Sequence, residues 1–294
     1  MPRHYSPLRY PGGKQKLTPF VIEILEENEI NGKYAEPYAG GAGVAIELLI
    51  SGRIKNIYLN DKDYGVYCFW YSVKNFNEDF CKKIEKVKLT ISEWKRQREV
   101  FRNQRSYTAF EVGFSFFYLN RCNRSGVLTG GVIGGMNQKG NYKIDARFNR
   151  LELIRRISIL GEFSSSIKIS NLDARTFITK YKHTFLNNAL IYLDPPYYVK
   201  GQGLYLNHYG HDDHVHLCNH LTKHLERHNW ILSYDAVTPI VDLYNDRPRF
   251  VYDLKYSAAE PRKGSEIFIF SDMLSIPAES RLPYINQGLE YIEY

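Results

Sequence analysis

Residues 194–197 read Asp-Pro-Pro-Tyr and carry groups that could take part in a reaction. They directly follow the apolar run 189–193. Two consecutive prolines fix φ and remove two backbone donors, so this turn is stiff and cannot extend a sheet. It presents a carboxylate, carbonyl groups and an aromatic ring at the carboxyl end of a predicted strand, where open α/β sheets hold their ligands. The carboxylate and a carbonyl can accept hydrogen bonds from an exocyclic amine, and the tyrosine ring can stack on a flat base. The alternative is a rigid turn that only ends the strand.

A glycine-rich turn, Gly40-Gly41-Ala42-Gly43, follows a predicted strand and opens a predicted helix. Backbone N–H groups in such a turn can approach a ligand closely. Asp61 lies 18 residues beyond Gly43 at the end of the next predicted strand, where an acidic residue accepts ribose hydroxyls. Position 46 is Ile, so the third glycine of the dinucleotide fingerprint is missing. These residues predict a nucleoside cofactor without pyrophosphate, and the alternative is a turn that only packs the helix tightly on the strand.

A third segment, Arg9-Tyr10-Pro11-Gly12-Gly13-Lys14, precedes a predicted helix. Its diglycine would let a lysine and an aromatic ring reach into a pocket, although an ordinary helix-entry turn has the same composition. A fourth stretch, 198–209, is rich in Gly and Tyr and follows the Asp-Pro-Pro-Tyr turn. It could form a lid over the site or an ordinary surface loop.

The elements that position these residues form an interrupted α/β pattern. Segments 1–62 and 166–294 alternate strands with helices, which indicates a doubly wound sheet, and segment 63–165 is predicted to be an inserted, mainly helical domain. The last two strands could pair as a hairpin. Predicted strands are 34–39, 56–59, 167–170, 189–193, 231–234, 250–254 and 267–270. Predicted helices are 17–30, 44–50, 76–87, 91–101, 114–119, 151–160, 174–180, 214–227 and 239–244, with an exposed loop or hairpin at 123–142.

The charge of the chain is concentrated in the insertion. The 294 residues carry a formal net charge of +7. Between positions 63 and 165, 18 Lys and Arg oppose 10 Asp and Glu, which gives +8, so the remainder carries −1. This imbalance predicts a polyanion partner for the insertion, and the alternative is a solvated basic face.

Composition excludes several other classes of protein. Hydrophobic residues make up 44% of the chain and charged residues 24%, as in ordinary globular proteins. No apolar run approaches the ~20 residues of a membrane span, and the N-terminus lacks the apolar core of a signal peptide. The four cysteines form no C-x-x-C pair, which argues against a zinc site and favours a reducing, cytoplasmic setting.

Seven of the nine histidines lie between 208 and 228. His216, His220, His224 and His228 follow one another at i, i+4 spacing and could share one face of a helix. Leu217, Leu221 and Leu225 form the adjacent apolar face, so we expect the histidines to flank a buried stripe, and we predict no metal site.

Four motifs together resemble those of the Dam-type, alpha-class (D12) DNA adenine-N6 methyltransferases. The resemblance covers about residues 6–271 and includes a segment similar to part of the family's target-recognition domain. In chain order, the motifs are Tyr10-Pro11-Gly12-Gly13-Lys14, Glu36-Pro37-Tyr38-Ala39-Gly40-Gly41-Ala42-Gly43, Asn60-Asp61 and Asp194-Pro195-Pro196-Tyr197, and the additional segment is Phe117-Tyr118-Leu119-Asn120-Arg121.

The resemblance implies a Rossmann-like sheet that binds S-adenosylmethionine (SAM) and an inserted target-recognition domain. It implies that the glycine turn cradles the methionine part, that Asp61 holds the ribose, that Asp173 meets the adenine, and that Asp194 serves both cofactor and base. The expected cofactor-binding residues are Tyr10, Lys14, Glu36, Ala39, Gly41, Gly43, Asp61, Asp173 and Asp194. The expected catalytic residues are Asp194, Pro195, Pro196 and Tyr197.

The expected substrate is an adenine flipped out of double-stranded DNA, because a stacked base cannot reach a buried methyl donor. Its N6 would donate to the Asp194 carboxylate and the Pro195 carbonyl, and Tyr197 would stack on it. Candidate DNA-binding residues are Asn120, Arg121, Asn123, Arg124 and Lys139, although a structural role is open for each.

Two alternatives are methylation of cytosine N4 or of RNA adenine, and a third is an inert DNA-binding module. The sequence leaves open the recognition site, the oligomeric state and a restriction or defence-system partner. A DNA-acting enzyme without a membrane partner would work in the cytoplasm, with the nucleoid.

Overall fold

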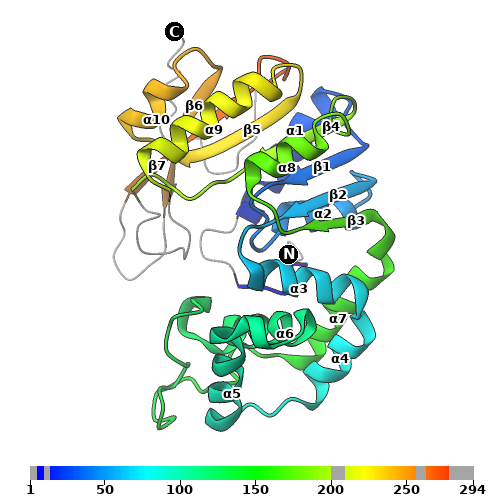
Figure 1. Cartoon of the computed structure of the whole chain (residues 1–294), viewed down its shortest axis with the longest axis vertical. Coiled ribbons are helices and arrows are strands. Elements are labelled where there is room, and N and C mark those ends of the chain that lie inside the picture. Colours follow the sequence, from blue (N-terminus) through cyan, green and yellow to red (C-terminus); the bar gives the residue numbers. More distant parts are fainter. Residues whose placement is uncertain (1–4, 10–13, 200–208, 256–262, 278–294) are drawn as a thin grey trace.

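The computed structural model describes residues 5–9, 14–199, 209–255 and 263–277 (Figure 1). Its sheet has seven strands in the order β3-β2-β1-β4-β5-β7-β6. All neighbouring strands are parallel except at β7, which is antiparallel to both β5 and β6. The strands are β1 (Lys33–Glu36), β2 (Asn56–Asn60), β3 (Ile167–Ser170), β4 (Ala189–Leu193), β5 (Asn229–Asp235), β6 (Arg249–Lys255) and β7 (Lys263–Phe270).

The order of the strands reverses between β1 and β4, and open α/β sheets bind ligands at such a point. Ala35 on β1 pairs with Ile191 on β4. The Glu36-Pro37-Tyr38 segment therefore leaves the sheet beside the segment that contains Asp194. Two motifs that are far apart in the sequence thus share one edge of the sheet.

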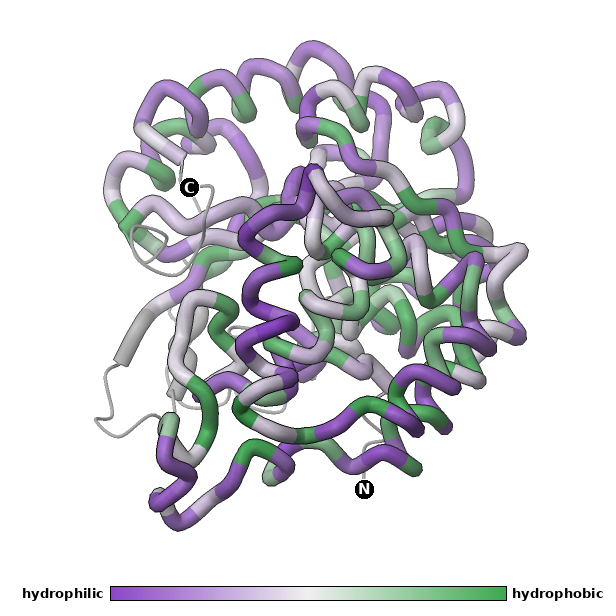
Figure 2. Tube along the Cα trace, turned by 60° about the horizontal axis from the view of Figure 1, so that its bottom comes forward, coloured by the Kyte–Doolittle hydropathy of each residue, from purple (hydrophilic) through white to green (hydrophobic). Residues whose placement is uncertain are grey.

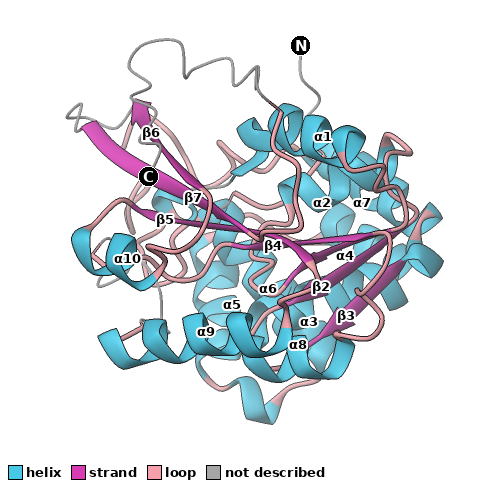
Figure 3. Ribbon diagram, turned by 90° about the horizontal axis from the view of Figure 1, so that it is seen from above, coloured by secondary structure: helices cyan, strands magenta, loops and turns pink. Residues whose placement is uncertain are grey.

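Alternate residues of the buried strands enter two different cores, as the period of a strand requires. Leu190 and Tyr192 face the first core, and Ile191 and Leu193 face the second. Helices α1 (Thr18–Glu27) and α2 (Gly43–Ile50) cover the first face. Helices α8 (Ala174–Tyr181), α9 (His211–His224) and α10 (Thr238–Leu243) cover the second (Figure 3). Along the surface helices, hydrophilic and hydrophobic residues alternate within each turn (Figure 2).

Segment 63–165 contains five α-helices: α3 (Tyr64–Asn75), α4 (Asn77–Lys86), α5 (Ile91–Arg102), α6 (Ala109–Cys122) and α7 (Arg150–Glu162). Helices α3 and α6 pack closely at Gly113, where a Cβ would lie 2.3 Å from the carbonyl oxygen of Cys68. Phe69 of α3 stacks on Phe117 of α6, with ring centroids 5.8 Å apart. Both rings belong to the same core as α1 and α2, so the insertion and the first face of the sheet share one hydrophobic core.

Helix α6 is almost wholly buried and begins at a capping box formed by Thr108 and Glu111. Its 14 residues are too few for a membrane span. In the part of the chain that the structure describes, no helix is long and apolar enough to cross a membrane.

The predicted elements agree with the structure except at some ends and at α3. Helix α3 was not predicted, although Asp63 caps it by accepting a hydrogen bond from Val66 N. Strand β1 ends at Glu36 rather than 39 because Pro37 has no N–H to continue the ladder. The predicted hairpin of the last two strands is confirmed, with Phe250 opposite Phe268.

Candidate active site

Asp194 follows β4 at the centre of the sheet, and its side chain is 24% exposed. Its Oδ1 accepts a hydrogen bond of 2.7 Å from Ser233 Oγ on the neighbouring strand β5. Ser233 is in turn held by the Tyr192 hydroxyl at 3.1 Å. No described residue donates a hydrogen bond to Oδ2. The carboxylate is therefore fixed through one oxygen and can accept a donor at the other.

Lys14 reaches the same place from the N-terminal segment. Its Nζ lies 2.8 Å from Glu266 Oε2 and 3.6 Å from Asp194 Oδ1. It also donates to the Tyr197 hydroxyl and lies 4.7 Å from the centroid of that ring. Glu266 comes from β7 and is 1% exposed. Sequence reasoning missed Glu266, because no local pattern distinguishes an acid on a strand far from the motifs.

The charges of this group are coupled. Burial raises the pKa of Asp194, while Lys14 lowers it and Glu266 raises it further. Burial by itself would lower the pKa of Lys14, but Asp194 and Glu266 more than offset this, so the pKa of Lys14 is raised. The structure thus places a protonated lysine among two carboxylates and a tyrosine.

The glycine turn between β1 and α2 adopts left-handed backbone at Gly40 (φ 44°) and at Ala42 (φ 46°). Asp61 Oδ2 accepts a hydrogen bond of 2.9 Å from Gly40 N. The Gly40 carbonyl accepts one of 2.9 Å from Trp70 Nε1 of α3, and the Gly41 carbonyl accepts one of 2.6 Å from Ser6 Oγ. The turn is therefore held from three sides before any ligand binds.

Asn60 joins three strand-end loops at this edge. Its Nδ2 donates to the carbonyl oxygens of Pro37 (2.9 Å) and Leu172 (3.0 Å). Its Oδ1 accepts from Ser170 Oγ and Leu172 N, each at 3.0 Å. The side chain is buried, and all of these bonds join residues at or just after the carboxyl ends of β1, β2 and β3. The Asn60-Asp61 motif gives Asn60 no role of its own, and the structure shows that it fixes the geometry of the edge.

Two acidic groups in this region have raised pKa values. Burial raises the pKa of Glu36 to about 8, although Ala45 N donates to it at 3.3 Å. Burial also raises the pKa of Asp61 to about 7, and the nearby charge of Asp63 adds to the shift. Asp173 differs: burial would raise its pKa, but the Arg175 backbone N–H and the charges of Arg175 and Lys62 lower it.

These raised values predict that the ligand-free protein loses stability as pH increases. A buried acid whose folded pKa lies above its unfolded value makes the folded state bind more protons, so the free energy of unfolding falls between the two values. For Asp61 this window extends from 3.8 to about 7, and for Glu36 from 4.5 to about 8. We expect the melting temperature to fall from pH 5 to pH 8 and the slope to be shallower in Asp61→Asn and Glu36→Gln. Calorimetry across this range checks it, and parallel curves for wild type and both variants would contradict it.

Asp235, at the end of β5, is a further residue that the sequence did not single out. Its two carboxylate oxygens accept from Tyr198 N and Val199 N, each at 2.9 Å. Asp235 therefore fixes the backbone that follows Tyr197. The proposed lid at 198–209 lies mostly outside the described residues, at 200–208.

The predicted site residues come together at one edge of the sheet, within the described part of the chain. Lys14, Tyr197 and Asp194 are in contact, and Gly40 is bonded to Asp61. Asp173 caps α8 through Arg175 N at 3.1 Å, and Tyr10 lies outside the described residues. Glu36 is the last residue of β1, and Ala39, Gly41, Gly43, Pro195 and Pro196 lie in the loops after β1 and β4 or at the start of α2.

Two of the five DNA-binding candidates have structural roles. Asn120 is 1% exposed, accepts from Arg9 N at 2.8 Å and donates to the carbonyls of Arg9 and Gly126. Asn123 is fully buried and accepts from Trp94 Nε1 at 2.7 Å. Its Nδ2 donates to two carbonyls of the following loop. In this conformation neither amide can reach a base. Asn120 and Asn123 therefore have the structural role that the sequence analysis gave as the alternative.

The other three candidates lie at the end of α6 or on the loop between α6 and α7, and two of them are exposed. Arg124 and Lys139 are exposed on the loop between α6 and α7. Arg121 donates to the Arg147 carbonyl, with Nε at 2.7 Å. Burial, together with the like charges of Arg9 and other arginines, lowers the pKa of Arg121 to about 10. The arginines at this junction therefore repel one another, which an anion would relieve.

The prediction that four histidines share one helical face is wrong for one of them. Helix α9 ends at His224, so His228 does not continue the helical face. Leu217, Leu221 and Leu225 are at most 1% exposed, which confirms the buried stripe. Among the described residues, no group of three or more His, Cys, Asp or Glu could hold a metal ion.

The strand order and the loops at its reversal point define a doubly wound α/β protein, a fold that binds ligands at this edge of the sheet. The model of the D12 class N6 adenine-specific DNA methyltransferases matches residues 10–258, and the chain belongs to this family. It is therefore an enzyme, a methyltransferase that acts on adenine in DNA, and such enzymes generally use SAM. No curated protein matches the chain.

Proposed function

We propose that this enzyme transfers a methyl group from SAM to the exocyclic N6 of an adenine flipped out of duplex DNA. One observation carries the proposal: Asp194 is fixed through Oδ1 by Ser233, and its Oδ2 accepts no hydrogen bond from a described residue. This half-open acceptor lies where the strand order reverses, next to the loop that leads to the glycine turn.

The loops after β1, β2 and β3 fit the cofactor. The turn at Gly41 and Gly43 would receive the methionine part, because left-handed backbone at Gly40 and Ala42 leaves room for close approach. Asp61, at the end of β2, would accept the ribose hydroxyls, and Asp173, after β3, would lie by the adenine. When bound, SAM supplies an electrophilic methyl group.

The residues of the Asp-Pro-Pro-Tyr turn would position the base. The N6 amine would donate to Asp194 Oδ2 and to the Pro195 carbonyl, and the Tyr197 ring would stack on the purine. Pro196 stiffens the turn, so these acceptors keep their separation. Holding the amine with its lone pair directed at the methyl group supplies most of the catalysis, because transfer is a displacement that depends on alignment.

The DNA would lie along the junction of the N-terminal segment and the insertion. Arg121, Arg124 and Lys139 offer positive charge there, and Arg9 adds to it. Phosphate contacts by such residues give affinity that depends strongly on salt. The repulsion between Arg121 and the neighbouring arginines supports the binding of an anion at this place.

The test is to incubate the enzyme with labelled SAM and unmethylated genomic DNA, and to digest the product to nucleosides. Label in N6-methyldeoxyadenosine is expected. Label in N4-methylcytosine, or transfer to RNA alone, would replace adenine in DNA as the substrate. Tight binding of SAM and DNA without transfer would indicate an inert module.

A further inference from the structure

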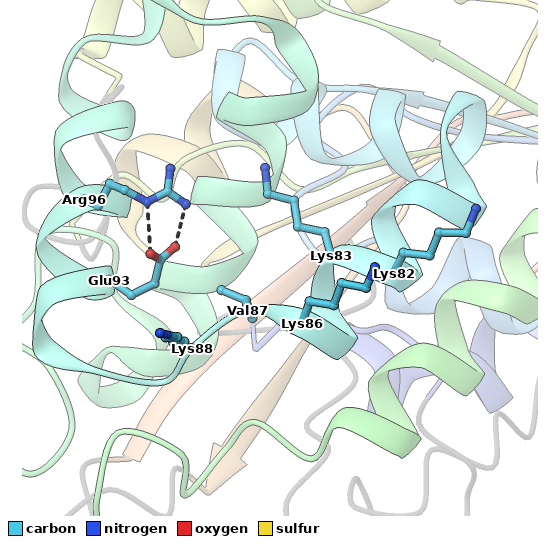
Figure 4. Close-up of a pocket in the computed structure, with 7 residues that line it drawn as sticks. All are labelled: Lys82, Lys83, Lys86, Val87, Lys88, Glu93 and Arg96. Atoms are coloured by element: carbon cyan, nitrogen blue, oxygen red, sulfur yellow. Dashed lines mark hydrogen bonds and ion pairs between the residues drawn. The ribbon is translucent and has the colours of Figure 1, made fainter.

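A basic pocket of about 370 Å³ lies where α4 and α5 meet, at the end of the insertion that is farther from the sheet (Figures 1 and 4). Helix α4, the connecting segment and helix α5 all contribute cations to it. These cations are Lys82, Lys83, Lys86, Lys88 and Arg96, and Glu93 is the one acid that lines the pocket.

The negative charge in the pocket is already neutralised. Glu93 accepts two hydrogen bonds from Arg96, at 2.9 Å to Nε and 2.7 Å to Nη2, as Figure 4 shows. It also accepts one of 2.6 Å from Gln97 Nε2. Its carboxylate is thus committed within α5 and offers little repulsion to an incoming anion.

The carbonyl groups at the end of α4 are neutralised in the same way. A helix C-terminus carries partial negative charge that would repel an anion. Here Arg150 of α7 donates to the carbonyls of Ile84, Glu85 (3.2 Å) and Val87 (2.5 Å). The Tyr118 hydroxyl donates to the Lys88 carbonyl at 3.0 Å.

By contrast, five cationic side chains line the pocket and only one acidic side chain does. Lys86 and Lys88 are exposed and form no ion pair with a described residue, and Lys82 lies 3.7–3.9 Å from two exposed acids of its own helix. Lys83 is held between two aromatic rings of α6. Burial lowers the pKa of Lys83 and the like charge of Arg96 lowers it further, while Glu111 and Glu93 offset part of the shift. An anion bound in the pocket would remove this repulsion.

We propose that this pocket binds backbone phosphates of duplex DNA that flanks the adenine in the active site. The inference rests on the proposed function, since DNA is the polyanion that the enzyme handles. Lys83 contacts α6 at Phe110 and Phe114, and the arginine junction begins at Arg121. Seven to eleven helical residues span about 10–16 Å. Duplex DNA advances about 3.4 Å per base pair, so the pocket would lie about three to five base pairs from the arginine junction.

The experiment compares duplexes of two lengths. In one variant, Lys82, Lys86 and Lys88 are replaced by Gln, because these side chains are exposed and their removal leaves the core unchanged. The matched control replaces Lys55, Lys180 and Lys223, which are equally exposed but lie before β2 and at the ends of α8 and α9, at the opposite edge of the sheet. Fluorescence anisotropy gives Kd for 10-base-pair and 40-base-pair duplexes of mixed sequence across a salt series.

We expect the first variant to bind the 40-base-pair duplex about tenfold more weakly, with the salt slope reduced by about one for each replaced lysine that contacts a phosphate. Its methyl transfer at saturating DNA should match the control, and the 10-base-pair duplex, which is long enough to reach a pocket about three to five base pairs away, should also lose affinity. Equal affinity of both variants for the long duplex would overturn the proposal, and a pocket that takes only free phosphate would give that result. Transfer to adenine is measured separately, so failure of the pocket and failure of the proposed function give different results.

Discussion

Replacement of Asp194 by Asn is expected to reduce kcat for methyl transfer by about 10²–10³-fold, the effect of removing one fixed polar group from a transition state. The change keeps the shape of the side chain but turns one acceptor oxygen into a donor. Since Ser233 donates to Oδ1 at 2.7 Å, the amide oxygen would stay with Ser233. Its NH₂ group would then face the adenine amine, which is also a donor. Single-turnover transfer to DNA with labelled SAM measures the change.

The matched control is Asp212→Asn, the same substitution at an exposed position in the first turn of α9. It should leave the rate unchanged. Calorimetric titration with SAM should show a much smaller change for Asp194→Asn than the change in kcat. Near-normal turnover by Asp194→Asn would exclude Asp194 as the group that holds the amine.

Lys14 and Glu266 are expected to shift the pH dependence of transfer in opposite directions. Asp194 must be ionised to accept the amine, so activity falls as pH decreases through its pKa. Lys14→Met removes a charge that lowers this pKa and should move the acid limb of kcat upward by about one unit or more. Glu266→Gln removes a charge that raises it and should move the limb downward.

Measurements of the free energy of unfolding distinguish this shift in pH dependence from a general loss of folding. Lys14→Met removes the cation that pairs with the buried Glu266 carboxylate, and breaking a buried pair costs about 3–5 kcal/mol. The double variant Lys14→Met/Glu266→Gln removes both charges and should recover much of that loss, with an acid limb near that of wild type. If both single variants shift the limb in the same direction, or neither shifts it, Lys14 does not act on Asp194 through its charge.

The sequence predicted the sheet well because its strands are short apolar runs that end at turn-forming residues. β3 and β4 have the predicted bounds, and β6 and β7 pair as expected. Helix α3 was missed because its sequence, rich in Tyr, Phe and Trp, shows no clear apolar stripe. It is buried on several sides, against α6 and against the glycine turn, and such a helix has no single polar face.

The site was predictable where one loop carries several of its residues, as at 40–43 and 194–197. It was not predictable where strands distant in the sequence converge. Asp235 reaches the Asp194 region because β5 pairs with β4, and Glu266 reaches it because β7 pairs with β5. The two asparagines Asn120 and Asn123 illustrate the opposite case: polar residues in a basic segment suggest DNA contacts, yet the fold uses them to shape its own loop.

Trp70 has a consequence for attempts to change the DNA specificity of this enzyme by exchanging its insertion for that of a relative. Its indole belongs to α3 at the start of the insertion, but it donates its hydrogen bond to the Gly40 carbonyl in the glycine turn. A chimera joined at position 63 would import a foreign α3 and leave that carbonyl without its donor. A junction after Asn75 would keep α3 with the recipient, but it would then require an incoming α6 with a glycine opposite Cys68. The practical unit of exchange is therefore the α4–α5 region and the loop between α6 and α7, grafted onto a retained α3–α6 pair.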